Sequence, residues 1–328
     1  MNITCTHHRS LALVLFVSLL VTGCGAVAPT TTSAPSATTA APPTVTAIPP
    51  TAQPSPPPSP TPADLPVEVI RDVPYVANGD PLQKLDIYRP QGLAGPFPIL
   101  FAIHGGGGNK SDMADLAYYF AKRGIAVVSI NHRQSPQYNY PVPVQDAFCA
   151  LAWTHANGGT YGLDPARIVA MGHSAGGTLA AMLGVVDDPA LFVKDCPYPL
   201  PTARRVRGVV TFTGMFDYLA CAAAATTPPI WREYQVTYLG GAPDKVPDTW
   251  KQASAITWID RQDPPFLLIH GLKDTTIDPE QSRSLAAALQ KAGVDVELLL
   301  VPDADHGAIV RREQSFQAVV AFCARLWP

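Results

Sequence analysis

The sequence has few charged residues and no excess of basic ones. Asp, Glu, Lys and Arg make up only 15% of its 328 residues, and the net charge is −3. Without a basic surplus to neutralise phosphates, nucleic-acid binding is not expected. The chain also lacks an HExxH motif and paired CxxC motifs, so we expect neither a metal nor an organic cofactor. Apolar residues make up 47%, which is enough for a sizeable core and excludes a fully disordered chain.

The N-terminus contains a short apolar run, residues 11–21, preceded by one fixed side-chain charge on Arg9. The run is too short to cross a bilayer of roughly 30 Å as a helix. It is typical of a secretory signal, with an uncleaved membrane anchor as the alternative. Residues 21–24, Val-Thr-Gly-Cys, resemble the bacterial lipoprotein signal. The resemblance implies a signal peptide over residues 1–23 and a lipid on Cys24, which would anchor the exported chain to the cell membrane or cell surface.

Residues 24–63 form a second region of biased composition. They are mostly Pro, Thr, Ser and Ala, include 12 prolines, and carry no charged side chain. Proline removes backbone donors and fixes φ, so neither a helix nor a sheet can propagate here. We therefore expect a disordered, semi-rigid tether between the lipid anchor and one folded domain over residues 64–328.

Residues 64–328 alternate short apolar runs with helical patterns. Six runs predict buried strands because they lack polar alternation: 98–103, 125–130, 167–171, 206–212, 265–270 and 294–301. Five segments have apolar residues at helical spacing: 112–123, 144–156, 175–186, 280–292 and 312–327. This order predicts an α/β fold with a mostly parallel central sheet and helices on both faces. An earlier pair of segments, 67–75 and 83–89, predicts an antiparallel edge hairpin around Asn78 and Gly79.

Two glycine-rich motifs follow predicted strands, on the side of the sheet where ligands of such folds bind. His104 precedes four glycines, residues 105–108, which allow a turn with free N–H groups. A flexible loop or a phosphate cradle is the alternative, but the Walker spacing is absent. Residues 172–176 have the pattern Gly-x-Ser-x-Gly between an apolar strand and an Ala-rich helix, the context of a nucleophile elbow. The turn would expose the Ser174 hydroxyl at a helix N-terminus, whose positive dipole end favours an oxyanion.

A serine nucleophile needs a base that takes its proton and an acid that orients the base. Asp274 follows the predicted strand 265–270, and His306 follows the strand 294–301. Ser174, Asp274 and His306 therefore follow three separate strands in the order serine, acid, histidine. Four other aspartates are alternative acids: Asp217, Asp278, Asp303 and Asp305. The last two flank His306 and are badly placed to reach its far ring nitrogen, and Asp278 is expected to cap the helix that follows.

With these motifs the sequence resembles the α/β-hydrolase superfamily, and most of all the esterase and lipase branch with an HGGG motif, related to hormone-sensitive lipase and acetyl-xylan esterases. The resemblance covers residues 67–326 and includes segments 85–90, 131–133, 140–146 and 161–168. It implies that the N–H groups of Gly106, Gly107 and Ala175 form an oxyanion hole. It also implies supporting roles for four neighbours: His104, Gly105, Gly172 and Gly176. Gly108 stands where such esterases often carry an aromatic residue, which implies a more open acyl pocket.

The resemblance implies two-step acyl transfer without a cofactor. Ser174 would attack the carbonyl of a small ester, short-chain or linked to a carbohydrate, while His306, held by Asp274, takes its proton. A serine peptidase or amidase with the same residues is one alternative. A non-catalytic surface lipoprotein that binds a ligand is another, although such a protein has no need of all three side chains. The oligomeric state is open.

Residues 217–259 form the least regular part of the domain and are expected to be a small lid insertion. Their aromatic side chains would stack on sugars or feruloyl rings, or else pack the insertion onto the domain: Trp231, Tyr234, Tyr238, Trp250 and Trp258.

Four cysteines remain after Cys5 and Cys24 are assigned to the signal and the anchor: Cys149, Cys196, Cys221 and Cys323. An even number in an exported chain predicts two disulfides among three possible pairings. We expect Cys149 with Cys196 and Cys221 with Cys323, with free buried thiols as the alternative.

Overall fold

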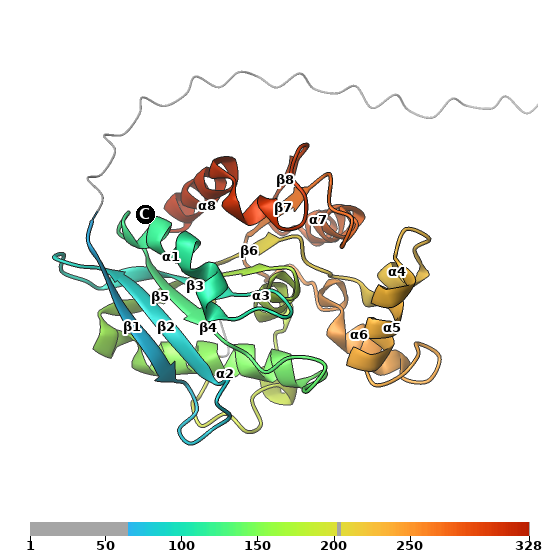
Figure 1. The fold of residues 1–328 in the computed structure, drawn as a ribbon, viewed down its shortest axis with the longest axis horizontal. Helices are drawn as coiled ribbons and strands as arrows, with labels where there is room; N and C mark the ends of the chain where they lie inside the picture. The colour runs from blue at the N-terminus through green and yellow to red at the C-terminus, as the bar shows by residue number, and fades with distance from the viewer. Residues whose placement is uncertain (1–64, 202–204, 328) are drawn as a thin grey trace, which may run out of the picture. The chain divides into compact units, whose positions relative to one another are not determined.

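An eight-stranded sheet organises residues 65–201 and 205–327, the parts of the chain that the computed structural model describes (Figure 1). The expected signal peptide over 1–23, the expected lipidation site Cys24 and the expected tether over 24–63 lie outside the described residues. The strands are β1 Val67–Pro74, β2 Lys84–Pro90, β3 Phe97–Ile103, β4 Ala126–Ile130, β5 Leu163–His173, β6 Gly208–Phe212, β7 Phe266–Gly271 and β8 Val296–Val301. Their order across the sheet is β1-β2-β4-β3-β5-β6-β7-β8. Among these strands, β2 alone runs in the opposite direction to the other seven. The expected mostly parallel sheet and edge hairpin are therefore confirmed.

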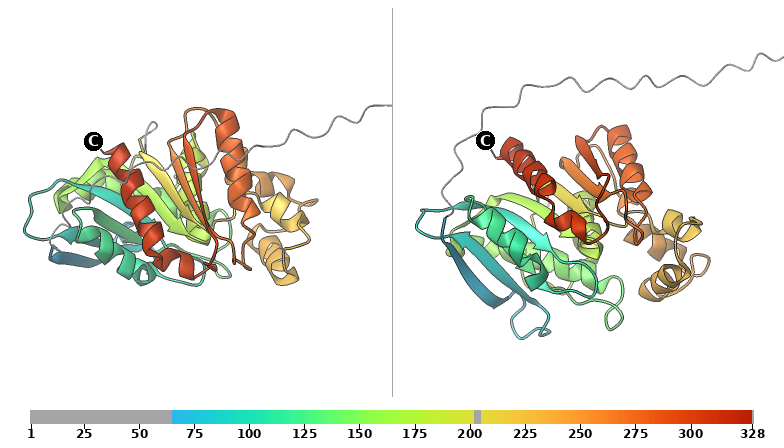
Figure 2. Two further views of the ribbon diagram at one scale, coloured as in Figure 1. Left: turned by 90° about the horizontal axis from the view of Figure 1, so that it is seen from above. Right: turned by 45° about the horizontal axis from the view of Figure 1, so that its top comes forward.

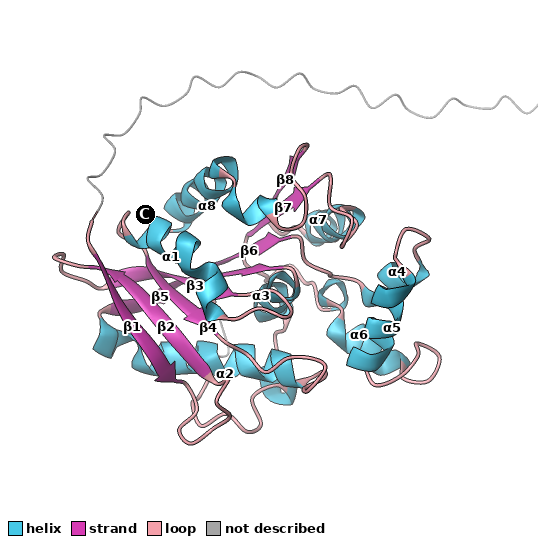
Figure 3. Ribbon diagram, in the orientation of Figure 1, coloured by secondary structure: helices cyan, strands magenta, loops and turns pink. Residues whose placement is uncertain are grey.

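Helices cover both faces of this sheet (Figure 3). They are α1 Ala114–Ala121, α2 Val142–Asn157, α3 Ala175–Val185, α4 Tyr218–Ala223, α5 Pro229–Tyr238, α6 Pro247–Ala253, α7 Glu280–Ala292 and α8 Glu313–Leu326. Short 3-10 turns are η1 Lys110–Met113, η2 Gly158–Tyr161, η3 Pro189–Leu191, η4 Ala255–Thr257 and η5 Ala308–Arg311. None of the helices in the described part of the chain is long and apolar enough to span a membrane.

The alternation of side chains along the strands divides the core into two layers. On β3, Ile99 and Phe101 belong to the layer that packs against α2, α3 and α7, whereas Leu100 belongs to the layer beneath α1 and α8. Strands β4, β6 and β7 are buried along their whole length. This is why their sequences are continuous apolar runs instead of alternating ones. The fold is the α/β-hydrolase fold.

The expected insertion over residues 217–259 contains α4, α5 and α6, which lie grouped at one end of the domain (Figure 1, Figure 2). Its aromatic residues have two different environments. Trp250 is fully buried and its indole N–H donates to the carbonyl of Gly241 at 3.0 Å, so it packs the insertion together. Trp231 and Tyr234 instead line a cavity that reaches Ser174.

The structure joins Cys149, on α2, to Cys196 by a disulfide with a Cα–Cα distance of 5.4 Å. The expected second disulfide is wrong, because Cys221 and Cys323 are free and buried. Cys323 belongs to the core layer beneath α8, whereas Cys221 lies inside the insertion beside Thr227. The two thiols are therefore buried in different parts of the domain and do not meet.

Replacing both Cys149 and Cys196 with alanine is expected to lower the free energy of unfolding by about 4 kcal/mol, because the bond closes a loop with a sequence separation of 47. Urea unfolding with and without a reductant measures this. The reductant should destabilise the wild type and leave the double variant unchanged. Equal stability of the two proteins under oxidising conditions would show that the disulfide contributes nothing.

Candidate active site

Ser174 occupies a sharp turn between β5 and α3. Its backbone has φ 56° and ψ −121°, a conformation that costs energy for any residue other than glycine. The turn is held because the N–H of Ser174 donates to the carbonyl of Phe212 on β6 at 2.8 Å. A side chain at Gly172 would collide with the carbonyl of Gly176, and one at Gly176 would collide with the carbonyl of Ile103. The two flanking glycines are therefore what allows the serine to project from the sheet edge.

The three side chains expected to form a triad lie within hydrogen-bonding distance of one another. Nε2 of His306 is 2.9 Å from Oγ of Ser174, and Nδ1 of His306 is 2.7 Å from Oδ2 of Asp274. They come from the loops after β5, β7 and β8. Because a carboxylate only accepts, Nδ1 carries the hydrogen and a neutral imidazole has its lone pair on Nε2. This tautomer leaves Nε2 free to take a proton from the serine hydroxyl.

Asp274 is held as a carboxylate by four donors. Its Oδ1 accepts the N–H groups of Thr276 at 2.8 Å and Ile277 at 3.0 Å. Its Oδ2 faces His306 and also lies 3.3 Å from Nε2 of His270. Burial alone would raise the pKa of Asp274, but hydrogen bonds from His270, His306 and the backbone outweigh it, and the pKa lies well below its usual value. The acid is therefore ionised at any pH at which the enzyme would work.

His270 is a site residue that the sequence analysis missed. It lies on β7 with no exposed surface, and its Nε2 is 3.0 Å from the carbonyl of Ile277. Since a carbonyl only accepts, Nε2 carries a hydrogen, and Nδ1 lies 2.7 Å from the hydroxyl of Ser282. His270 thus contacts the same carboxylate oxygen of Asp274, Oδ2, that faces His306. In the sequence it looked like the last residue of an apolar strand.

The four alternative acids are engaged elsewhere. Asp217 caps α4 by accepting the N–H of Ala220, and Asp278 accepts the N–H of Glu280 at the start of α7, as expected. Asp303 pairs with Arg312. Asp305 accepts two backbone N–H groups in its own loop, those of Gly307 and Ala308.

The glycine loop after β3 lies beside Ser174, and Gly106, Gly107 and Ala175 line the same cavity as the serine. The N–H of Gly107 donates to Oε1 of Gln134 at 2.8 Å. The amide of Gln134 in turn donates from Nε2 to the carbonyl of Gly108 at 2.9 Å. Gln134, which the sequence analysis also missed, therefore holds the loop through both the oxygen and the nitrogen of its amide. In this state the N–H of Gly107, one of the three expected oxyanion donors, is already hydrogen-bonded.

His104 lies at the base of this loop, where a bracing residue was expected. It is 1% exposed, its Nδ1 donates to the carbonyl of Gly105 at 2.8 Å, and its ring stacks on His132 with centroids 4.4 Å apart. Burial, with repulsion from His132, lowers the pKa of His104 to about 3. Burial likewise lowers the pKa of His132, and it lowers that of His173 to about 4. These three rings are neutral supports of the site.

These depressed pKa values predict an acid-sensitive fold. Between about pH 6.5 and pH 4 the unfolded chain binds protons that the folded chain does not, so the free energy of unfolding falls as pH falls. Each histidine contributes a slope approaching about 1.4 kcal/mol per pH unit. Urea unfolding of the wild type and His104→Asn across this range tests it. The variant should show the shallower dependence, and parallel curves would contradict a neutral His104.

Two cavities meet at Ser174 and His306. The larger, of about 510 Å³, has a mainly aromatic and apolar wall: Tyr140, Met215, Tyr218, Trp231, Tyr234 and Tyr238. Most of this wall comes from the insertion. The smaller, of about 310 Å³, is more polar and includes Asp112, Asp115 and Arg311. An ester bound at the serine would thus place its two halves in chemically different surroundings.

Several known proteins are similar to this chain. It is 31% identical to the esterase LipC of Mycobacterium tuberculosis over 239 residues, 70% of this chain and 57% of that protein. It is also 31% identical to the esterase LipQ of the same organism over 263 residues, 76% of this chain and 61% of that protein. The chain thus spans about 60% of the length of these curated relatives.

The solved structure of a truncated carbohydrate esterase from gut microbiota superimposes with a TM-score of 0.67 at 25% identity, and the match covers 81% of this chain and 98% of that one. Residues 85–289 match the BD-FAE family. The matched region begins within β2 and ends within α7, so it includes Ser174 and Asp274. The chain therefore belongs to the BD-FAE family and shares the α/β-hydrolase fold of its esterase relatives.

Proposed function

We propose that this protein is a carboxylic ester hydrolase of the HGGG type that works through an acyl-enzyme on Ser174. The observation that carries the proposal is the continuous hydrogen-bonded chain from the Ser174 hydroxyl through His306 to Asp274, at the meeting point of two cavities. The esterase names of the relatives support the same class of reaction.

In the proposed mechanism, Oγ of Ser174 attacks the ester carbonyl while Nε2 of His306 takes the hydroxyl proton. His306 then gives that proton to the leaving alcohol, and a water molecule repeats the attack on the acyl-enzyme. The N–H groups of Gly106 and Ala175 would receive the developing oxyanion. The N–H of Gly107 would join them once its hydrogen bond to Gln134 is exchanged for one to the substrate.

The two cavities support a substrate with unlike halves. The aromatic wall contributed by the insertion suits an apolar or aromatic group, and the polar cavity beside Asp112 and Arg311 suits hydroxyl groups such as those of a sugar. We therefore propose short-chain or carbohydrate-linked esters as the substrate class. The structural similarity to a gut carbohydrate esterase supports the same class.

A direct test uses short-chain nitrophenyl esters together with acetylated and feruloylated sugars. Turnover of the esters, with covalent labelling of Ser174 by a phosphonate, is the expected result. Hydrolysis of a matched anilide faster than the ester would indicate an amidase or peptidase. No turnover of any of these compounds would favour a binding protein.

We further propose that the protein is an exported lipoprotein whose residues 64–328 are the catalytic domain. Cys24→Ser removes the sulfur that would carry the lipid, so this variant is expected to move from the membrane fraction to the soluble fraction. Fractionation followed by immunodetection measures the shift, with Cys5→Ser as the matched control that stays in the membrane fraction. Retention of the Cys24 variant would indicate an uncleaved anchor.

A further inference from the structure

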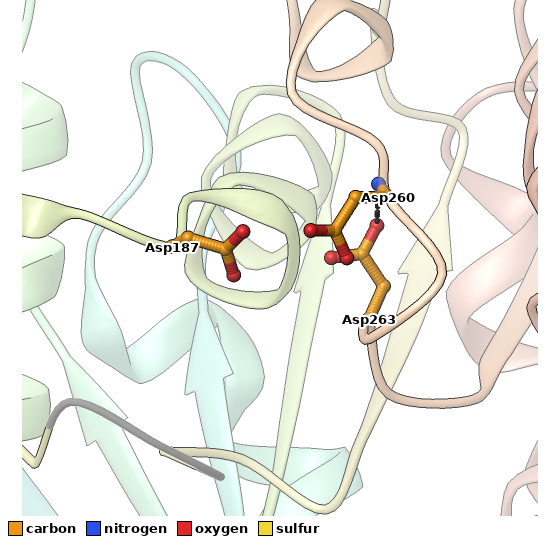
Figure 4. Close-up of side chains that lie close together, drawn as sticks. All are labelled: Asp187, Asp260 and Asp263. Atoms are coloured by element: carbon orange, nitrogen blue, oxygen red, sulfur yellow. Dashed lines mark hydrogen bonds between the residues drawn. The ribbon is translucent and has the colours of Figure 1, made fainter.

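Three aspartates from two segments that are distant in the sequence converge on one point of the domain (Figure 4). Asp187 follows α3, whereas Asp260 and Asp263 lie in the loop between the insertion and β7. Each offers a carboxylate oxygen, and these oxygens all lie within 4.8 Å of one another. The cluster therefore joins the segment after the nucleophile helix to the segment that ends the insertion.

Asp263 has an oxygen with no hydrogen-bond partner. Asp263 is 9% exposed, and its Oδ2 accepts the N–H of Asp260 at 3.0 Å. Its Oδ1 is buried without a partner in the described part of the chain. Figure 4 shows this second oxygen directed toward the carboxylates of Asp260 and Asp187. A buried carboxylate oxygen without a donor costs free energy unless a ligand satisfies it.

The negative charge of the cluster is not fully compensated by nearby cationic side chains. Among the described residues, none of the three carboxylates forms an ion pair with a lysine, arginine or histidine side chain. The nearby buried Arg205 donates to the backbone carbonyls of Asp187 and Val186 instead. Three carboxylates and one guanidinium sum to −2 when all are ionised, which is the charge that one divalent cation neutralises.

Proton binding is the competing way to relieve this repulsion. Burial raises the pKa of Asp263 to about 7, and the neighbouring carboxylates of Asp260 and Asp187 add to the rise. The pKa of Asp187 is raised as well, by partial burial and by hydrogen bonding with Asp260.

We propose that Asp187, Asp260 and Asp263 bind one divalent cation, preferentially Ca²⁺, which cross-links the segment after α3 to the end of the insertion. A cluster that offers only carboxylate oxygens suits a hard cation. The three oxygens lie within 4.8 Å of one another, close enough to share one cation at Ca–O distances of about 2.3–2.6 Å. Mg²⁺ usually keeps several waters and is held by one or two carboxylates, so three carboxylates favour Ca²⁺. The cation would stabilise the aromatic wall of the larger cavity without touching the substrate.

Calorimetric titration of the chelator-treated, dialysed protein with CaCl₂ tests this proposal. One saturable site is expected, with an affinity for Ca²⁺ at least tenfold higher than for Mg²⁺. Asp263→Asn and Asp187→Asn should each weaken Ca²⁺ binding at least tenfold. Asp195→Asn, which changes an exposed aspartate in the same connection after α3, should bind like the wild type. Absence of saturable Ca²⁺ binding, or equal binding by the Asp263 variant, would overturn the proposal.

Thermal unfolding supplies a second readout that does not depend on activity. Ca²⁺ at 100 times its Kd should raise the Tm of the wild type by about 5 °C. Asp263→Asn should be at least as stable as the wild type in chelator, because one like charge is gone, yet gain nothing from Ca²⁺. A stability that responds to pH but not to Ca²⁺ in the wild type would assign the cluster to a shared proton and refute the cation site. Neither outcome depends on the proposed ester hydrolysis.

Discussion

Ser174→Ala is expected to lower kcat for a short-chain ester by about 10⁶-fold, the loss typical of removing the nucleophile from a serine triad. Residual turnover of about 10³–10⁴ over the uncatalysed rate would remain from the oxyanion donors and the binding cavities. The change removes one oxygen atom and leaves the hydrogen bond between His306 and Asp274 in place. Initial rates of nitrophenyl acetate hydrolysis, at equal protein concentration, measure the effect.

The fold should survive this substitution. The strained backbone at position 174 is set by the flanking glycines and by the bond from its N–H to Phe212, and alanine keeps both. The Tm of Ser174→Ala should therefore equal that of the wild type. Ser284→Ala is a matched control, because this serine is on α7 and bonds only to Glu280. Equal activity of the wild type and Ser174→Ala would reject Ser174 as the nucleophile.

Much of the fold follows from local pattern. The apolar run 98–103 became β3 and the run 125–130 became β4, because central strands covered on both faces must be apolar throughout. Element ends were less predictable. Strand β5 extends from Leu163 to His173, beyond the predicted 167–171, since its first residues pair with β3 through backbone groups that leave no side-chain pattern.

That Ser174, Asp274 and His306 meet could be predicted because each follows a strand, where chain order and the direction of the sheet fix its place. The residues that support them could not. Gln134 holds the glycine loop through two hydrogen bonds, and His270 lies 3.3 Å from Oδ2 of Asp274. These contacts depend on loop conformations that no periodicity encodes. A polar residue ending an apolar strand, as His270 does, was the one available signal.

Long-range pairing could be predicted only in part: the expected disulfide of Cys149 with Cys196 is present, but the second is not. Cys221 and Cys323 remain as a pair in a chain that is expected to be exported, yet they lie in separate interiors and stay free. The convergence of Asp187 with Asp263 depends on how the connection after α3 passes the end of the insertion. Counting residue types gives the candidates for such pairs, whereas the path of the chain decides which of them meet.

Asp274→Asn is expected to lower kcat by about 10⁴-fold with little change in KM. In the wild type, Oδ1 of Asp274 accepts two backbone N–H groups, and Oδ2 faces His306. The amide oxygen of asparagine must take the Oδ1 position, since an NH₂ group there would oppose two donors. Its NH₂ would then face Nδ1 of His306 and require that nitrogen to accept. The imidazole would carry its hydrogen on Nε2, in the tautomer that cannot take a proton from Ser174.

The KM should change little because Asp274 does not line either cavity, so substrate binding does not use it. Asp278→Asn is the matched control, because this nearby aspartate hydrogen-bonds Thr226 and the start of α7 instead of His306. The kcat of this variant should stay within about twofold of the wild-type value. In Asp274→Asn the new NH₂ group would also face the N–H of His270, so two donors would oppose each other. A modest fall in Tm should therefore accompany the loss of kcat. Full activity of Asp274→Asn together with inactivity of Asp217→Asn would move the acid to the loop after β6.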